Sequence, residues 1–124
     1  MTTQSVFPSL RYRDAAAAIP WLVSAFGLTE RAVYADSDGV VRHAELGWAD
    51  NIIMIGTSEE NTRNSTGAAW LYLTVADPDA HFAKAVAAGA PVERDLADTD
   101  HGSREYTARD LEGNLWSFGT YLPG

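Results

Sequence analysis

The hydrophobic and polar positions of the chain follow the same order of elements twice. Alternating apolar positions predict strands, and apolar positions at helical spacing predict one helix in each half. The first half reads as a strand over 6–12, a helix over 15–26, and strands over 31–35, 41–46 and 51–56. The second half reads as a strand over 70–75, a helix over 78–88, and strands over 92–96, 104–109 and 115–121. Two such units predict an α+β fold with one curved mixed sheet and helices on one face.

Each predicted helix carries its own start and stop signals. Asp14 and Asp77 stand at the N-cap positions, where a carboxylate accepts from the first free backbone N–H groups. Gly27 and Gly89 follow the last helical residues, as glycine commonly does at a helix C-terminus. Pro20 lies inside the first helix and lacks a backbone donor, so we expect either a later start or a kink.

The residues themselves also repeat. The segment 51–57 (NIIMIGT) recurs 63 positions later as 114–120 (NLWSFGT). The polar stretch 58–67 between the two halves has the composition of a linker. We therefore expect a single domain over residues 1–124, with one module over 5–57, a linker over 58–67 and a second module over 68–122.

Composition and charge exclude several classes of function. The 124 residues include 17 acidic and 9 basic side chains, for a net charge of −8, and no cysteine. Binding to nucleic acid or an anionic membrane needs clustered Lys and Arg, and the absence of cysteine excludes disulfides, thiolate nucleophiles and Cys-ligated zinc. Without a signal peptide or a long apolar run, we expect a cytoplasmic protein. The negative field favours cationic ligands at long range, although salt screens it.

Five short motifs lie at related places in the two modules. They are 14–19 (DAAAAI), 25–27 (AFG), 42–46 (RHAEL), 87–89 (AAG) and 109–116 (RDLEGNLW). Together with the duplication, they resemble the vicinal oxygen chelate superfamily, and most closely its glyoxalase/bleomycin-resistance/dioxygenase-like proteins. The resemblance covers nearly the whole chain. It implies paired βαβββ modules, often in a dimer with strands or modules exchanged, and a concave sheet that holds a divalent metal or a small organic ligand.

The metal-dependent members of that superfamily take four ligands, His, Gln or Glu, from fixed strand positions. Carried over to this chain, those positions fall on Phe7, Met54, Trp70 and Ser117. None of these side chains supplies the imidazole or carboxylate that divalent metals bind. We therefore expect neither metal nor cofactor. The pattern resembles the metal-free antibiotic-binding members, because aromatic rings and a thioether suit a flat organic molecule.

Strand alternation extends this candidate site to neighbouring positions. The candidate ligand-binding residues are Phe7, Ser9, His43, Glu45, Trp48, Met54, Trp70, Tyr72 and Ser117. The same alternation turns Arg11, Glu105 and Thr107 toward the cavity, and Trp116 and Phe118 toward the core. The loop 98–103 could close over a ligand. His81 reads as a surface residue of the second helix.

His43 and Glu45 leave the function open, because residues two apart on a strand point the same way. They could act as a base with its orienting carboxylate, as part of a metal site, or as a polar pair that hydrogen-bonds a ligand. We favour the last, in a homodimeric, metal-free protein that sequesters an aromatic or polycyclic natural product, as in antibiotic self-resistance. The alternative is a lyase, isomerase or dioxygenase of the same superfamily that uses His43 and Glu45. A third possibility is an accessory domain with a vestigial pocket.

Overall fold

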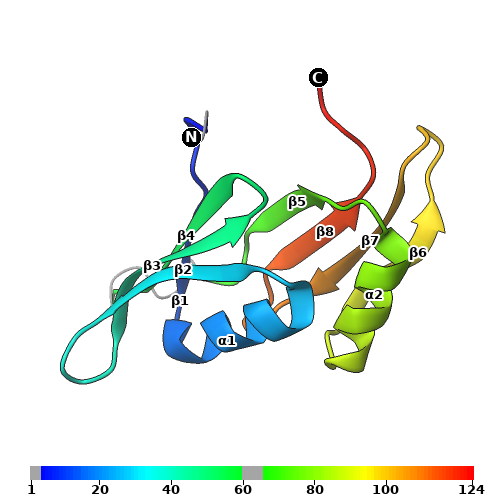
Figure 1. Cartoon of the computed structure of the whole chain (residues 1–124). Helices are drawn as coiled ribbons and strands as arrows, with labels where there is room; N and C mark the ends of the chain where they lie inside the picture. The colour runs from blue at the N-terminus through cyan, green and yellow to red at the C-terminus, as the bar shows by residue number, and fades with distance from the viewer. Residues whose placement is uncertain (1–3, 60–65) are drawn as a thin grey trace.

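The elements follow one another in the order that the sequence predicts (Figure 1). The structure is a computed structural model and describes residues 4–59 and 66–124, so most of the predicted linker 58–67 lies outside the described residues. The first module contains β1 (Ser9–Tyr12), α1 (Ala15–Phe26), β2 (Thr29–Ala35), β3 (Val41–Trp48) and β4 (Asn51–Thr57). The second contains β5 (Trp70–Thr74), α2 (Pro78–Ala87), β6 (Val92–Asp98), β7 (Arg104–Arg109) and β8 (Leu115–Gly119). The predicted α+β fold is confirmed.

The strands form two mixed four-stranded sheets, one in each module, where the sequence predicts one curved mixed sheet. Their orders are β1-β4-β3-β2 and β5-β8-β7-β6, so the two sheets have the same topology. β1 runs parallel to β4 and β5 parallel to β8, whereas the other neighbours are antiparallel. Both helices lie on the same side of the sheets (Figure 1). The opposite side of each sheet is called the helix-free face below.

The helix ends have the chemistry that the sequence predicts. Asp14 accepts a hydrogen bond from the backbone N–H of Ala17 at 3.1 Å, and Asp77 caps α2 in the same way. Gly27 ends α1 at a φ of 81°, a left-handed conformation that costs glycine little. Pro20 lies within α1 on its exposed side, so the expectation of a later helix start is wrong.

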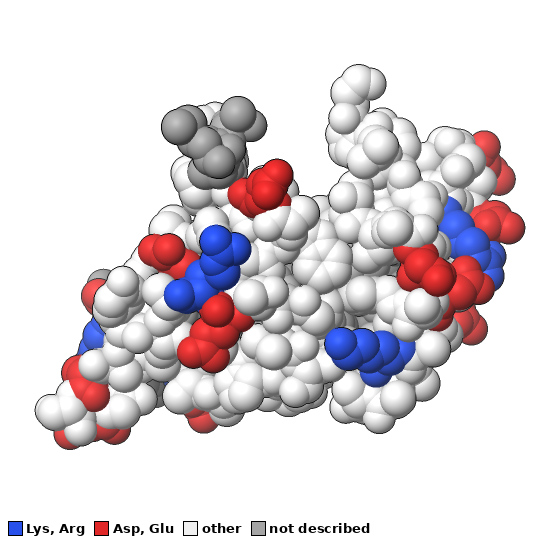
Figure 2. Space-filling model, in the orientation of Figure 1, with Lys and Arg blue, Asp and Glu red and all other residues white. Residues whose placement is uncertain are grey.

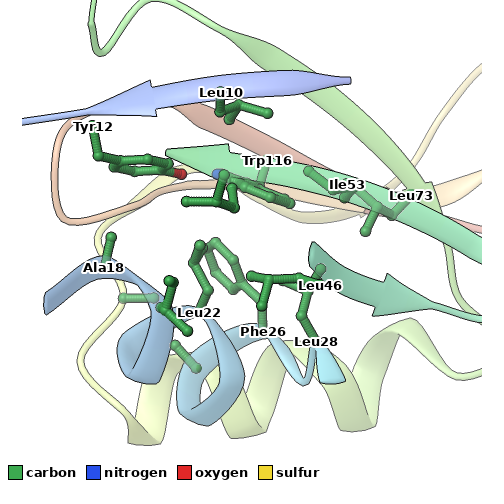
Figure 3. Close-up of a cluster of buried hydrophobic side chains, with 14 of the residues drawn as sticks. Leu10, Tyr12, Ala18, Leu22, Phe26, Leu28, Leu46, Ile53, Leu73 and Trp116 are labelled. Carbon is green, nitrogen blue, oxygen red and sulfur yellow. The ribbon is translucent and has the colours of Figure 1, made fainter. Parts of the chain in front are cut away.

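The two modules share one hydrophobic core between the helices and the sheets (Figure 3). Phe26, at the end of α1, lies with its ring centroid 5.6 Å from that of Trp116 and 5.0 Å from that of Phe118, both on β8. All three side chains are fully buried, as predicted for Trp116 and Phe118. Each buried aromatic ring contributes about 2–3 kcal/mol relative to exposure, so this contact ties α1 to the sheet of the other module.

His81 lies at the boundary between the modules, and the prediction of a surface position is wrong. Its Nε2 donates to the backbone oxygen of Phe26 at 2.7 Å, and its Nδ1 lies 2.6 Å from the Tyr106 hydroxyl. Because a carbonyl oxygen only accepts, Nε2 carries the proton and Tyr106 donates to Nδ1. Burial lowers the pKa of His81, and the positive charge of Lys84 lowers it further. Its ring packs 4.2 Å from that of Phe118.

Candidate functional site

Three predicted site residues lie side by side on the helix-free face of the first sheet. Ser9 on β1 pairs with Met54 on β4, and Met54 pairs with Glu45 on β3. Their neighbours along each strand, such as Leu10, Ile55 and Leu46, are buried in the core instead. Phe7 lies just before β1 and is 40% exposed. Alternation along the strands therefore does bring these residues to one surface.

His43 and Glu45 form the closest polar contact on this face. The His43 Nε2 lies 2.9 Å from a Glu45 carboxylate oxygen, and both side chains are about two-fifths exposed, at 39% and 40%. The ring of Tyr34 on β2 stacks against His43 at a centroid distance of 6.0 Å. An ion pair this exposed contributes about 0–1 kcal/mol to stability, so the contact mainly fixes the orientation of the two side chains.

On the second sheet, a chain of hydrogen bonds holds Trp70 in one orientation. The indole Nε1 of Trp70 donates to Ser117 Oγ at 2.8 Å, and Ser117 Oγ lies 2.6 Å from Thr107 Oγ1. Ser117 and Thr107 are 6% and 4% exposed, whereas Trp70 is 55% exposed. The indole therefore covers two buried hydroxyls and still presents more than half of its surface to solvent.

The four positions that hold metal ligands in the superfamily do not fit a divalent metal here. Trp70 offers only an N–H donor, and Ser117 already accepts that donor. Phe7 has no donor atom, and Met54 has only a thioether, which is a weak ligand for oxygen-seeking cations. Across residues 4–59 and 66–124, no three His, Asp or Glu side chains converge as a metal site requires.

Tyr72 is held by the segment that follows β8. Its hydroxyl donates to the backbone oxygen of Tyr121 at 2.8 Å, and burial raises the pKa of Tyr72. Gly119 lies beneath it, where a Cβ would stand 2.6 Å from Glu105 Cβ and 2.9 Å from the Tyr72 hydroxyl. Only glycine leaves room for this packing. The candidate loop 98–103 joins the same cluster, because Ser103 Oγ accepts from the Tyr121 backbone N–H at 3.2 Å.

A groove of about 450 Å³ runs between the edge strands β1 and β5 and is called the β1–β5 groove below. It is lined by Pro8, Ser9, Leu10, Ala69, Trp70, Leu71 and Tyr72. It thus brings together Ser9, Trp70 and Tyr72 from the two modules. Met54 adjoins it through Ser9, and Ser117 lies beneath Trp70. A space of this size is in the range of small-molecule sites.

Trp48 lies apart from this groove. Its Nε1 donates to the Thr74 backbone oxygen at 3.0 Å, and its ring lies 5.7 Å from both His81 and Phe118. It borders a second cavity of about 540 Å³ that includes Gly27, His81 and Lys84. Trp48 also lines a cavity of about 330 Å³ together with Tyr72 and Pro8. The structure therefore places Trp48 between the modules, where it is near Tyr72 but does not line the β1–β5 groove.

Arg94 lies near the site, although the sequence alone does not predict it as a site residue. Its guanidinium carbon lies 5.2 Å from the centre of the Trp70 ring. The register of β6 against β7 shifts on both sides of Arg94, so strand alternation could not place its side chain. Figure 2 shows Lys and Arg in separate small groups over one face of the molecule, without a continuous basic surface.

Comparisons with known proteins agree with this architecture. Residues 5–118 match the family described as the Glyoxalase/Bleomycin resistance protein/Dioxygenase superfamily. Rv0887c of Mycobacterium tuberculosis is 35% identical over 121 residues, which cover 90% of this chain and 71% of that protein. The solved structure of TioX from Micromonospora sp. ML1 is 34% identical, with a TM-score of 0.82 over 96% of this chain and 99% of TioX. TnmS3, an antibiotic binding protein from Streptomyces sp. CB03234, is 20% identical, with a TM-score of 0.77 over 98% of this chain and 100% of TnmS3.

Proposed function

The chain belongs to the Glyoxalase/Bleomycin resistance protein/Dioxygenase superfamily, and from that premise we propose that it binds a small organic molecule without a metal. The ligand is an aromatic or polycyclic natural product, which the protein sequesters rather than transforms. The observation that carries this proposal is the hydrogen bond between Trp70 and Ser117. Trp70 and Ser117 stand at two of the four positions that hold metal ligands in the superfamily, and here their hydrogen bond holds an exposed indole in place.

The composition of the groove supports an aromatic ligand. Trp70 and Tyr72 are 55% and 37% exposed on one wall, and Phe7 is 40% exposed near the other. Aromatic faces stack on flat rings with a gain of about 0.5–1.5 kcal/mol beyond the area that they bury. TnmS3, which shares the fold, is an antibiotic binding protein. We propose an aromatic antibiotic as the ligand class of this chain.

Titration with aromatic antibiotics tests the proposal directly. We expect quenching of tryptophan fluorescence by at least one of a bleomycin-type, a phenazine, a mitomycin and an enediyne-type compound, with saturation near one ligand per chain. The variant Trp70→Leu keeps three of the four tryptophans and should lose most of the quenching. Folded protein that responds to none of these compounds would count against the proposal.

The contact between His43 and Glu45 supports a second candidate, an enzyme of the same superfamily. Their 2.9 Å contact suits a general base with its orienting carboxylate. The two candidates differ in what happens to the ligand. Mass spectrometry of a bound compound after long incubation should recover it unchanged under the binding proposal. Turnover that His43→Gln abolishes would favour the enzyme instead.

We also propose that the protein acts as a single domain of two modules, 5–57 and 68–122, and as a cytoplasmic homodimer. Val6, just before β1, and Leu122, after β8, are apolar, strongly exposed and outside the groove, so a second copy could cover them without closing the groove. Sedimentation velocity at micromolar concentration should give twice the chain mass of 13.4 kDa, and a single 13.4 kDa species would refute the dimer. Separately, no helix in the described part of the chain is long and apolar enough to cross a membrane.

A further inference from the structure

The described arginines fall into two groups by their partners. Four have an ion-pair or hydrogen-bond partner within the chain. The protein carries a net charge of −8, so acidic side chains outnumber basic ones. Arg42 pairs with Asp36, Arg104 with Asp79 and Asp98, Arg109 with Glu93, and Arg13 bonds to the Thr66 hydroxyl. Among residues 4–59 and 66–124, the other three arginines, Arg11, Arg31 and Arg94, make neither an ion pair nor a side-chain hydrogen bond with another described residue. The protein therefore has more acidic than basic side chains, and yet Arg11, Arg31 and Arg94 have no acidic partner.

These three arginines share one feature, their position on the helix-free faces. Arg11 alternates with the buried Leu10 and lies across Gly56, where a Cβ would stand only 1.9 Å from its guanidinium. Arg31 is the extra residue of a bulge in β2 and lies over Gly47 of β3, at 3.2 Å from the Cβ position. Arg94 lies over Trp70. The three guanidinium groups therefore lie on the helix-free faces, although none of them is among the residues that line the groove.

The carboxylates on the same faces already have partners. Glu45 contacts His43 at 2.9 Å, and Glu105 accepts from the Ser103 hydroxyl at 2.8 Å. These contacts orient the two carboxylates, and neither carboxylate pairs with Arg94, so Arg94 is a positively charged donor beside Trp70 without an acidic partner. The long-range field of the chain favours cations, but salt screens it over about 8 Å, so groups in contact with a ligand decide its charge.

Trp70 and Arg94 form the part of the site that is best ordered for a ligand. The indole is fixed through Ser117 and Thr107, so stacking on it costs little side-chain entropy. The Arg94 guanidinium covers one face of the indole, with its carbon 5.2 Å from the ring centre. A flat ring that takes its place on the indole would leave the guanidinium at the edge of that ring, where its N–H donors can reach an acidic substituent. Arginine binds a carboxylate through two parallel hydrogen bonds when the geometry allows.

We propose that Trp70, at the margin of the β1–β5 groove, and Arg94 together select a flat aromatic acid, whose ring takes the place of the guanidinium on the indole and whose carboxylate is bound by Arg94. The inference rests on the proposed function and adds the charge of the ligand to it. The net charge of the protein alone predicts a cationic ligand, whereas Arg94 predicts an anionic one. Arg94 is the residue that determines this specificity, and Ser117 and Thr107 are positioning residues for the indole.

Two phenazines that differ in one substituent, a charged carboxylate or a neutral carboxamide, test the proposal by calorimetry at pH 7.5. Phenazine-1-carboxylate and phenazine-1-carboxamide present the same ring, and the wild-type protein should bind the carboxylate about tenfold more tightly. Arg94→Gln should remove this preference by weakening the binding of the carboxylate alone. Trp70→Leu should weaken the binding of both ligands about tenfold. Arg42→Gln is the matched control, because it removes the same charge from an arginine paired to Asp36 and should keep the preference.

Each other outcome overturns the proposal. An equal or tighter affinity for the carboxamide, or a preference that survives Arg94→Gln, removes the role of Arg94. If neither phenazine binds but a neutral or cationic antibiotic does, the charge inference is wrong and the proposed function stands. If no aromatic compound binds at all, the proposed function fails as well. Arg94 and Trp70 are exposed, and unchanged melting temperatures would show that their variants are folded.

Discussion

A buried hydrogen bond between the modules allows a quantitative test of how the chain holds together. Asp110, in the turn before β8, is 4% exposed and accepts five hydrogen bonds. One carboxylate oxygen accepts from the Tyr12 hydroxyl at 2.5 Å and from the side chains of Asn114 and Trp116, each at 3.0 Å. The other accepts from the backbone N–H groups of Glu112 and Asn114. Of these donors, only Tyr12 belongs to the first module.

The variant Tyr12→Phe removes that single bond and leaves the ring in place. Tyr12 is fully buried, and a hydrogen bond to a charged acceptor contributes about 1.5–3 kcal/mol. Asp110 keeps four donors, so the loss should not exceed this range. For a chain of this size the melting temperature should fall by roughly 5–12 °C.

Urea unfolding followed by circular dichroism measures the change in the free energy of unfolding. Tyr34→Phe is the control, because Tyr34 is 61% exposed on β2 and its loss should stay within about 0.5 kcal/mol. A Tyr12→Phe variant as stable as the wild type would refute the view that this bond joins the modules. Equal losses in the two variants would refute it as well.

Two further predictions concern pH and packing. Burial lowers the pKa of folded His81 below its ordinary value of 6.5, so the unfolded chain takes up this proton first and the free energy of unfolding should fall as pH drops below about 6.5. His81→Gln should flatten this dependence between pH 7.5 and 5.5 in urea titrations, whereas His101→Gln, at an exposed loop position, should leave it unchanged. Gly119→Ala should destabilise the chain by about 1–3 kcal/mol, because the new methyl group would meet Glu105 on the neighbouring strand; a neutral effect in thermal melts would contradict that packing.

Periodicity and the internal repeat were enough to predict the order of elements. The alternation in β8 places Trp116 and Phe118 in the core and Ser117 on the opposite face, as the structure has them. The aspartate caps at Asp14 and Asp77 are equally local signals, because the partner N–H lies three residues away. Such features depend on neighbours in sequence, and the sequence alone therefore predicts them.

Contacts between the modules could not be predicted in the same way. His81 has a polar sequence environment, and its burial depends on Phe26, which lies 55 positions away in the chain. Asp110 sits in a segment typical of a turn, and nothing local indicates that it accepts a bond from Tyr12. Arg94 follows a shift of strand register, which breaks the alternation that located Ser117.

Binding of an aromatic ligand in the β1–β5 groove without a metal is the property on which the proposed function depends. The most direct test is one calorimetric titration of phenazine-1-carboxylate, carried out in excess EDTA and again without it. We expect saturation near one ligand per chain and the same dissociation constant in both conditions. The phenazine should be recovered chemically unchanged. Binding that EDTA abolishes would contradict metal-free binding. Absence of binding in both conditions would contradict the aromatic acid as ligand, and the proposed function would fail as well if none of the other aromatic antibiotics bound.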